Sequence, residues 1–226
     1  MVRRIVTLAM PALLAAAPVW GEPCAPSLVS IDSDEPFEVH EARFDTTGGS
    51  GGTAYAIFFD LGEGFFETRM TSNEFGRTEI RSSDRYQIDA AFSGPAVIDA
   101  VLEVTAVRFN SCGLECAWAM TRIEWREEAG GSVDHLADTQ QAGVYHFEMT
   151  LPVTVTFGVP FTLETVIETQ VRGLGANLFA RADVSTRLRF DRLPAGARVR
   201  SCRGFDSAPH TPTAHASWGG VKARYR

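Results

Sequence analysis

Acidic side chains are the residues of this chain whose type and spacing most directly suggest chemistry. Glycoside hydrolases hold two carboxyl groups about 5–9.5 Å apart. Two pairs, Asp99 with Glu103 and Glu164 with Glu168, each share one face of a predicted strand. Four residues of extended chain separate such Cα atoms by about 13 Å, which is too far for that reaction. Pairs across neighbouring strands stay open, but no catalytic residue is predicted, and solvation of a polar face explains these acids.

A second acidic group, Asp32, Asp34 and Glu35, occupies a predicted turn before Pro36. Calcium requires six or more oxygen ligands, and this turn lacks the glycine and the terminal glutamate of an EF-hand loop. The three acids are therefore a weak candidate for a structural calcium site. No other metal site and no cofactor is expected, because the histidines show neither HExxH nor His-x-His spacing.

The four cysteines are Cys24, Cys112, Cys116 and Cys202. An even number of cysteines in an exported chain predicts disulfides, with three possible connectivities. Cys112 and Cys116 are expected to pair because they flank a short tip between two predicted strands, which leaves Cys24 to pair with Cys202. A zinc site at Cys112 and Cys116 is the alternative, although no histidine or second cysteine pair lies nearby.

Aromatic residues cannot all face one core. Phe58 and Phe59 are adjacent, as are Phe65 and Phe66, and adjacent residues of a strand point to opposite faces. Burial in a core is the favoured interpretation for most of the aromatic side chains. The alternative is a ligand platform on the outside, for which Trp118 and Trp125 are the weak candidates.

The elements that must position these residues are strands. Apolar and polar residues alternate along 178–190, 161–172 and 149–157, which is typical of strands with one buried face. Further strands are predicted, with less regular patterns, at residues 37–43, 54–60, 65–70, 77–81, 86–92, 97–109, 117–125 and 197–203. No helical periodicity follows residue 21. Glycine and proline separate the strands, and the glycine-rich stretch Thr46–Gly52 is expected to be a flexible loop.

Many strands with no helices between them predict an all-β fold, a single antiparallel β-sandwich of jelly-roll or Greek-key type. The sandwich is expected over residues 22–205. Residues 206–226 are predicted to be a linker and a C-terminal tail, and Trp218–Arg226 could be a sorting motif, a last strand or a disordered end.

The N-terminus has the pattern of a secretory signal peptide over residues 1–21. Arg3 and Arg4 precede an apolar run from Ile5 to Trp20, and small residues follow. A run of about 16 residues is short for a membrane span of about 20. We therefore expect a secreted, periplasmic or cell-surface protein with no transmembrane anchor after cleavage. The net charge of −7 argues against a nucleic-acid partner.

Two further stretches carry a resemblance. Val159-Pro160-Phe161-Thr162-Leu163 precedes a strand of alternating small and apolar residues, and Leu193-Pro194-Ala195-Gly196 precedes the last predicted strand. In this order the chain resembles the exported bacterial β-sandwich proteins that often end in a PEP-CTERM anchor. It departs from them in lacking a Pro-Glu-Pro tripeptide and a C-terminal apolar span. The resemblance implies a sandwich outside the cytoplasm, in proteins that are mostly of unassigned function.

Together these observations favour an exported, non-catalytic sandwich that serves in surface structure or interaction, with a surface glycan or a protein as partner. The alternative is a carbohydrate-binding module, which would use calcium if the acidic turn binds it. An enzyme acting on polysaccharide is the least favoured of the three.

Overall fold

The computed structural model describes residues 23–32, 35–91, 93–110, 117–127, 132–137, 142–173 and 179–207. Every regular element in these ranges is a β-strand. The strands are β1 (Ser27–Ile31), β2 (Phe37–Val39), β3 (Arg43–Ser50), β4 (Thr53–Asp60), β5 (Phe65–Ser72), β6 (Phe75–Asp89), β7 (Pro95–Asn110), β8 (Ala117–Glu127), β9 (Ser132–Ala137), β10 (Gly143–Thr156), β11 (Phe161–Gly173), β12 (Ala180–Asp191) and β13 (Arg198–Ser201).

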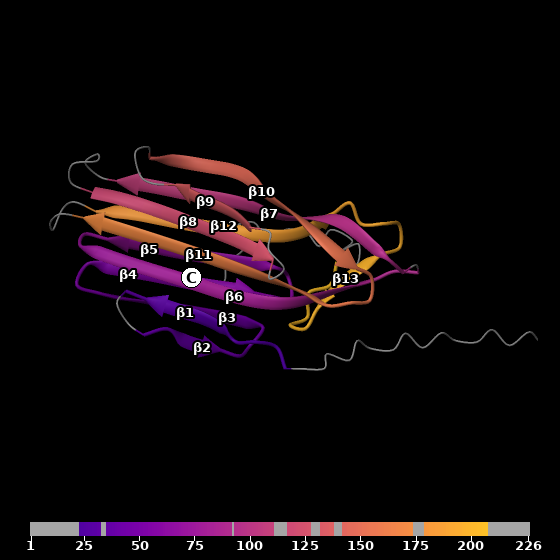
Figure 1. Ribbon diagram of the computed structural model, residues 1–226. Helices are drawn as coiled ribbons and strands as arrows, with labels where there is room; N and C mark the ends of the chain where they lie inside the picture. Colours follow the sequence, from indigo (N-terminus) through magenta and orange to yellow (C-terminus); the bar gives the residue numbers. More distant parts are fainter. Residues whose placement is uncertain are drawn as a thin grey trace, which may run out of the picture.

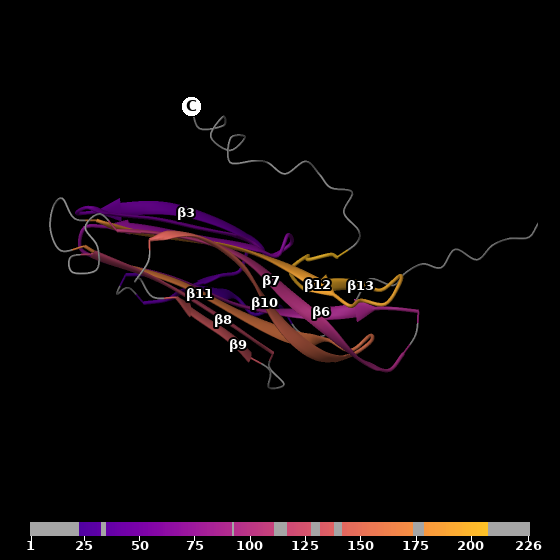
Figure 2. The same ribbon diagram turned by 90° about the horizontal axis from the view of Figure 1, so that it is seen from above.

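Within the described residues, the strands form two antiparallel sheets. Sheet A is 7-stranded, in the order β2-β1-β6-β11-β8-β9, with β13 also paired to β6. Sheet B is 6-stranded, in the order β10-β7-β12-β5-β4-β3. The strands of both sheets run roughly along the long axis of the molecule in Figure 1. Figure 2 shows the layer with β3 lying over the layer with β11, β8 and β9. The predicted β-sandwich is confirmed.

The sandwich forms because one face of each main strand is apolar. Along β12 buried and more exposed residues alternate from Ala180 to Asp191, as the pattern in the sequence predicts. The inward side chains meet between the sheets in a main core that contains Trp125, Phe59, Ile80 and Ile167. A smaller, separate cluster of buried residues lies beyond it, made of Met70, Ala119, Val171, Ala180 and Ala182.

Several boundaries differ from the predicted ones. Residues 77–81 and 86–92 were expected as separate strands, but β6 runs unbroken through Ser82, Ser83 and Asp84. Thr46–Gly52, expected as a flexible loop, is largely strand β3, which pairs with β4 as far as Ser50. The glycines allow this close pairing, since a Cβ on Gly48 would overlap the ring of Tyr55 on β4. Strands β1 and β9 were not predicted.

Both ends of the described chain are tied to the same edge of β6. Strand β1 pairs with residues 78–81 of β6, and β13 pairs with residues 86–89 of the same edge. The disulfide between Cys24 and Cys202 joins the two strands where they approach each other. This is the pairing expected from the sequence, whereas Cys112 and Cys116 lie outside the described residues. The ordered pairing continues just past residue 205, because Asp206 forms a β-bridge with Arg200.

Replacing both cysteines, as Cys24→Ser with Cys202→Ser, should lower the free energy of unfolding by about 2–5 kcal/mol, since the bond closes a long loop. Urea unfolding of the oxidised chain and of the double variant measures the difference. A reducing agent should destabilise the unaltered chain more than the double variant, which retains only Cys112 and Cys116. Equal midpoints for the two oxidised proteins would contradict a stabilising role for this bond.

The outward face of sheet A is covered by ion pairs. Arg77 on β6 contacts Glu168 on β11 at 2.7 Å and Glu79 at 2.6 Å. Glu168 was expected to be solvated, but its residue is only 3% exposed. The side chains of Arg77 and Gln170 both donate hydrogen bonds to it. The Glu168 carboxylate, in the middle of the sheet, therefore receives from neighbouring side chains the hydrogen bonds that water would otherwise supply.

Arg77→Ala should lower the free energy of unfolding by about 1–3 kcal/mol, because the buried Glu168 carboxylate loses its charged partner. The matched control is Arg122→Ala on the same face, where the exposed pair with Glu124 at 2.9 Å should contribute less than about 1 kcal/mol. Thermal and urea unfolding measure both. Equal losses in the two variants would show that burial of Glu168 has no energetic consequence.

Candidate functional site

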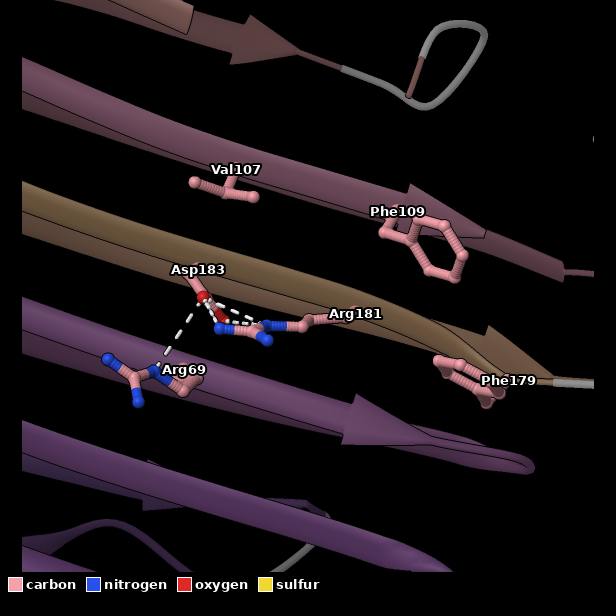
Figure 3. A pocket seen from close by; sticks show the side chains of 6 residues that line it. All are labelled: Arg69, Val107, Phe109, Phe179, Arg181 and Asp183. Carbon is pink, nitrogen blue, oxygen red and sulfur yellow. Dashed lines mark hydrogen bonds and ion pairs between the residues drawn. The ribbon is translucent and has the colours of Figure 1, made fainter. Parts of the chain in front are cut away.

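A hollow of about 520 Å³ opens on the outward face of sheet B, lined by Arg69, Val107, Phe109, Phe179, Arg181 and Asp183. These residues come from three neighbouring strands, β5, β7 and β12, and from the residue just before β12 (Figure 3). Strand register brings them together, since Asp183 lies opposite both Val107 of β7 and Arg69 of β5. Because alternate residues share a face, Arg181 and Asp183 point outward together.

Charged side chains form the centre of the hollow. Arg181 Nε lies 3.0 and 2.9 Å from the two carboxylate oxygens of Asp183. Arg69 Nε lies 3.6 Å from the same carboxylate, and Arg69 Nη2 contacts Glu67 at 2.7 Å. The pKa of Arg181 is raised above its usual value, first by its hydrogen bonds to Asp183. The two arginines and two acids balance in formal charge.

Two phenylalanine rings form the apolar end of the hollow. Phe109 and Phe179 have ring centroids 5.5 Å apart at an interplanar angle of 35°. They are 44% and 41% exposed, although large apolar side chains usually lie inside. Both rings stand at the ends of β7 and β12, beside the Arg181 side chain (Figure 3). An exposed aromatic pair in a concave surface is typical of a contact site.

This arrangement combines an apolar platform with directional hydrogen-bonding groups. Small-molecule sites are concave, mostly apolar, and carry a few well-placed polar groups that fix the ligand's orientation. Here the rings can stack against an apolar ligand face, the guanidinium groups can donate hydrogen bonds, and the Asp183 carboxylate can accept them. The lining itself contains two arginines and one aspartate, and Glu67, which pairs with Arg69 but does not line the hollow, offsets the remaining positive charge.

The aromatic candidates of the sequence are not the residues of this hollow. Trp125 is 0% exposed in the main core, so a ligand platform built on it is ruled out, because neither ring face reaches the surface. The favoured interpretation, burial in a core, is the correct one for this residue. The backbone of Trp118 lies in β8, while its side chain is outside the described part of the structure.

Of the three calcium candidates, the structure describes Asp32 and Glu35. Asp32 Oδ1 accepts a hydrogen bond from the backbone N–H of Arg77 at 3.1 Å, so this carboxylate holds the turn after β1 against β6. Glu35 is exposed, and Asp34 lies outside the described residues. Across the ranges that the structure describes, no three His, Cys, Asp or Glu residues lie close enough to hold a metal ion.

The acids considered for hydrolysis are each paired with an arginine. Asp99 lies 2.8 Å from Arg192, and Glu103 lies 2.6 Å from Arg189. Glu164 contacts Arg126 at 2.6 Å, and Glu168 contacts Arg77 at 2.7 Å. Each of these four carboxylates is therefore engaged by a guanidinium group, and solvation alone does not explain them.

A second concentration of polar groups lies inside the sandwich, at the disulfide. Asp84 of β6 points inward, is only 3% exposed, and lies with Oδ1 3.3 Å from Sγ of Cys202. Burial raises the pKa of Asp84 from 3.8 to about 6, against the opposing hydrogen bond from Ser201 and the charge of Arg203. Asp84 also contributes to the raised pKa of the buried Tyr86.

Sequence reasoning missed both groups for identifiable reasons. Phe109 lies near the end of a long strand that has apolar residues on both faces. The sequence therefore did not distinguish its outward face from its inward face. Phe179 lies two and four residues before Arg181 and Asp183, so alternation along the predicted strand puts all three on its polar face. This shared face was the pattern from which the group could have been found. Asp84 follows two serines and therefore resembled a turn between two strands.

Comparisons with known proteins add little. No family model matches the chain, and no curated protein matches it. Among solved structures, one similarity is to the structure of infectious bursal disease virus Gx strain, at 8% identity and a TM-score of 0.18. It covers 77% of this chain, and this chain spans 57% of that one. In the part of the chain described, no helix is both long and apolar enough to cross a lipid bilayer.

The raised pKa of Asp84 predicts how stability depends on pH. The folded state holds this proton more tightly than the unfolded state, so lowering the pH through about 6 should stabilise the unaltered protein. The gain from Asp84 between pH 7 and 5 should be roughly 1 kcal/mol. Asp84→Asn should lose this contribution, as measured by urea unfolding at both pH values. A difference between variant and unaltered protein that does not change with pH would contradict the assignment.

Proposed function

We propose that this chain is an exported, non-catalytic binding protein and that the hollow on sheet B binds a neutral saccharide. The observation that supports this most is the exposed Phe109–Phe179 ring pair beside the paired side chains of Arg181 and Asp183. Export is supported by the signal-like pattern of residues 1–21 and by the Cys24–Cys202 disulfide, since such bonds persist in oxidising compartments.

A saccharide suits the hollow better than an ion or a purely apolar ligand. A sugar ring has an apolar C–H face that can cover an aromatic ring, and hydroxyl groups around its edge that donate and accept hydrogen bonds. Arg181 supplies fixed N–H donors and Asp183 supplies acceptor oxygens beside the rings. The balanced charges of Arg69, Arg181, Glu67 and Asp183 favour a ligand that carries no charge.

Binding should be measured with the mature protein on a glycan array, followed by titration calorimetry with the soluble oligosaccharide that binds. Phe109→Ala and Phe179→Ala should each weaken binding about tenfold, because each removes one ring of the platform, worth on the order of 1 kcal/mol or more. The matched control is Phe75→Ala, which removes a 51% exposed phenylalanine that does not line the hollow and should leave affinity unchanged.

Three results would contradict this function: an array on which the unaltered protein binds nothing, binding that survives loss of both rings, and equal weakening by the Phe75 control. Salt provides a further check on ligand charge. Affinity for a neutral sugar should change less than about twofold between low and high salt, since no counterions are exchanged. A steep fall with salt would identify the ligand as an anion and overturn the neutral assignment.

A further inference from the structure

The surroundings of the Cys24–Cys202 bond form a built site, distinct from the hollow. Backbone pairing fixes Cys202: its N–H donates to Arg85 O at 2.9 Å, and Ser201 pairs with Tyr86 of β6. These bonds do not depend on the disulfide. They hold the sulfur against Asp84, whose Oδ1 lies 3.3 Å away.

The Cys24 side of the site is held by a buried arginine. Arg203 donates hydrogen bonds to the backbone carbonyls of Ala25, Glu41 and Val39, at 3.1 Å for Glu41 and 3.4 Å for Val39. Charge-assisted bonds of this kind are stronger than neutral ones. Ala25 directly follows Cys24, so Arg203 keeps the segment of Cys24 beside the Cys202 sulfur through interactions in which neither sulfur atom takes part.

From this geometry we propose that Asp84 is the internal proton acceptor for closing the Cys24–Cys202 disulfide, which forms in a domain that is already folded. A thiol must lose its proton before it can attack a disulfide. Asp84 is the acidic side chain in contact with the Cys202 sulfur, and it is buried with one carboxylate oxygen, Oδ2, that has no hydrogen-bond partner.

The reaction balances with a low-molecular-weight disulfide as the oxidant. Cys24 first exchanges with it, giving a mixed disulfide and releasing one small thiol. The Cys202 thiol then passes its proton to the Asp84 carboxylate, and the thiolate attacks the Cys24 sulfur. The new sulfur–sulfur bond forms, the bond to the small molecule breaks, and the leaving thiolate takes the proton from Asp84. Two protein thiols are oxidised and one small disulfide is reduced to two thiols.

Charge explains why transfer inside the site suits this step. The groups that face Asp84 are the Arg203 guanidinium, the Ser201 hydroxyl, the Tyr86 ring and the backbone N–H of Arg85, with Glu41 near Arg203. Moving the proton from sulfur to carboxylate leaves one negative charge in the site before and after, and Arg203 balances it. A thiolate beside a carboxylate that stayed ionised would place two buried negative charges next to each other, which is costly.

The test follows the closing step in the full chain, carrying Cys112→Ser and Cys116→Ser so that two thiols remain. The reduced protein is mixed with oxidised glutathione, and acid-quenched samples are analysed by mass spectrometry, which separates formation of the mixed disulfide from its closure. Asp84→Asn should slow closure at least tenfold at pH 7 and leave formation of the mixed disulfide unchanged. Asp45→Asn, with the same charge change at an exposed position of β3, should close at the unaltered rate.

The pH profile separates a proton-transfer role from a purely structural one, and needs no variant that might fail to fold. Closure in the unaltered chain should level off above the pH at which Asp84 ionises. Without an internal acceptor it should rise about tenfold per pH unit until the pH nears the ordinary thiol pKa of about 8.5. A continuous rise in the unaltered chain would overturn the proposal, as would unchanged closure in Asp84→Asn or equal slowing in Asp45→Asn.

Discussion

Pairing along strand β6 is the interaction on which the rest of this structure depends. One edge of β6 pairs with β11 over almost its whole length, and the other edge carries β1 and then β13. The first and last strands of the described chain are thus neighbours in one sheet although they are far apart in sequence. The Cys24–Cys202 bond and the Arg203 hydrogen bonds close the junction between them. Strand β6 must continue without a break at Ser82 and Ser83 for β1 and β13 to share its edge and for the disulfide to join them.

The two outward faces of the sandwich have different properties because their side chains pair differently. On sheet A, arginines and glutamates alternate across β6, β11 and β8, and Arg77, Arg122 and Arg126 each pair with a glutamate. Such a surface offers hydrogen-bonding groups that already bind each other. Sheet B carries comparable pairs, but it also exposes Phe109 and Phe179 at one end. Sheet A also exposes Phe37 and Phe75, and what distinguishes Phe109 and Phe179 is that both rings line the hollow beside paired charged side chains.

The sequence predicted the fold well where one rule governed the residues. Alternation along β12 required a strand with one buried face, and the two-sheet architecture followed from many such strands. Prediction failed where local and tertiary effects compete. Ser82 to Asp84 look like a turn, yet pairing with residues 163–165 of β11 keeps them extended in β6. Trp125 could have faced either way, because one residue of register decides its face. The sequence pattern puts Glu168 on the solvent face of its strand. In the folded structure, however, the side chains of Arg77 and Gln170 cover it and donate hydrogen bonds to it.

The hollow and the disulfide lie at opposite ends of β12, and the interior changes between them. Near the disulfide, Phe190 packs with Tyr86, Phe161 and Phe205 in the main core. Beneath the hollow, the inward residues of β12 are Ala180 and Ala182, which belong to the smaller cluster with Met70. Less apolar volume supports this end, so its strands should open locally at lower free energy than the disulfide end. The hollow thus lies at the end with the smaller apolar cluster, while the covalent bond secures the end where the first and last strands of the described chain meet.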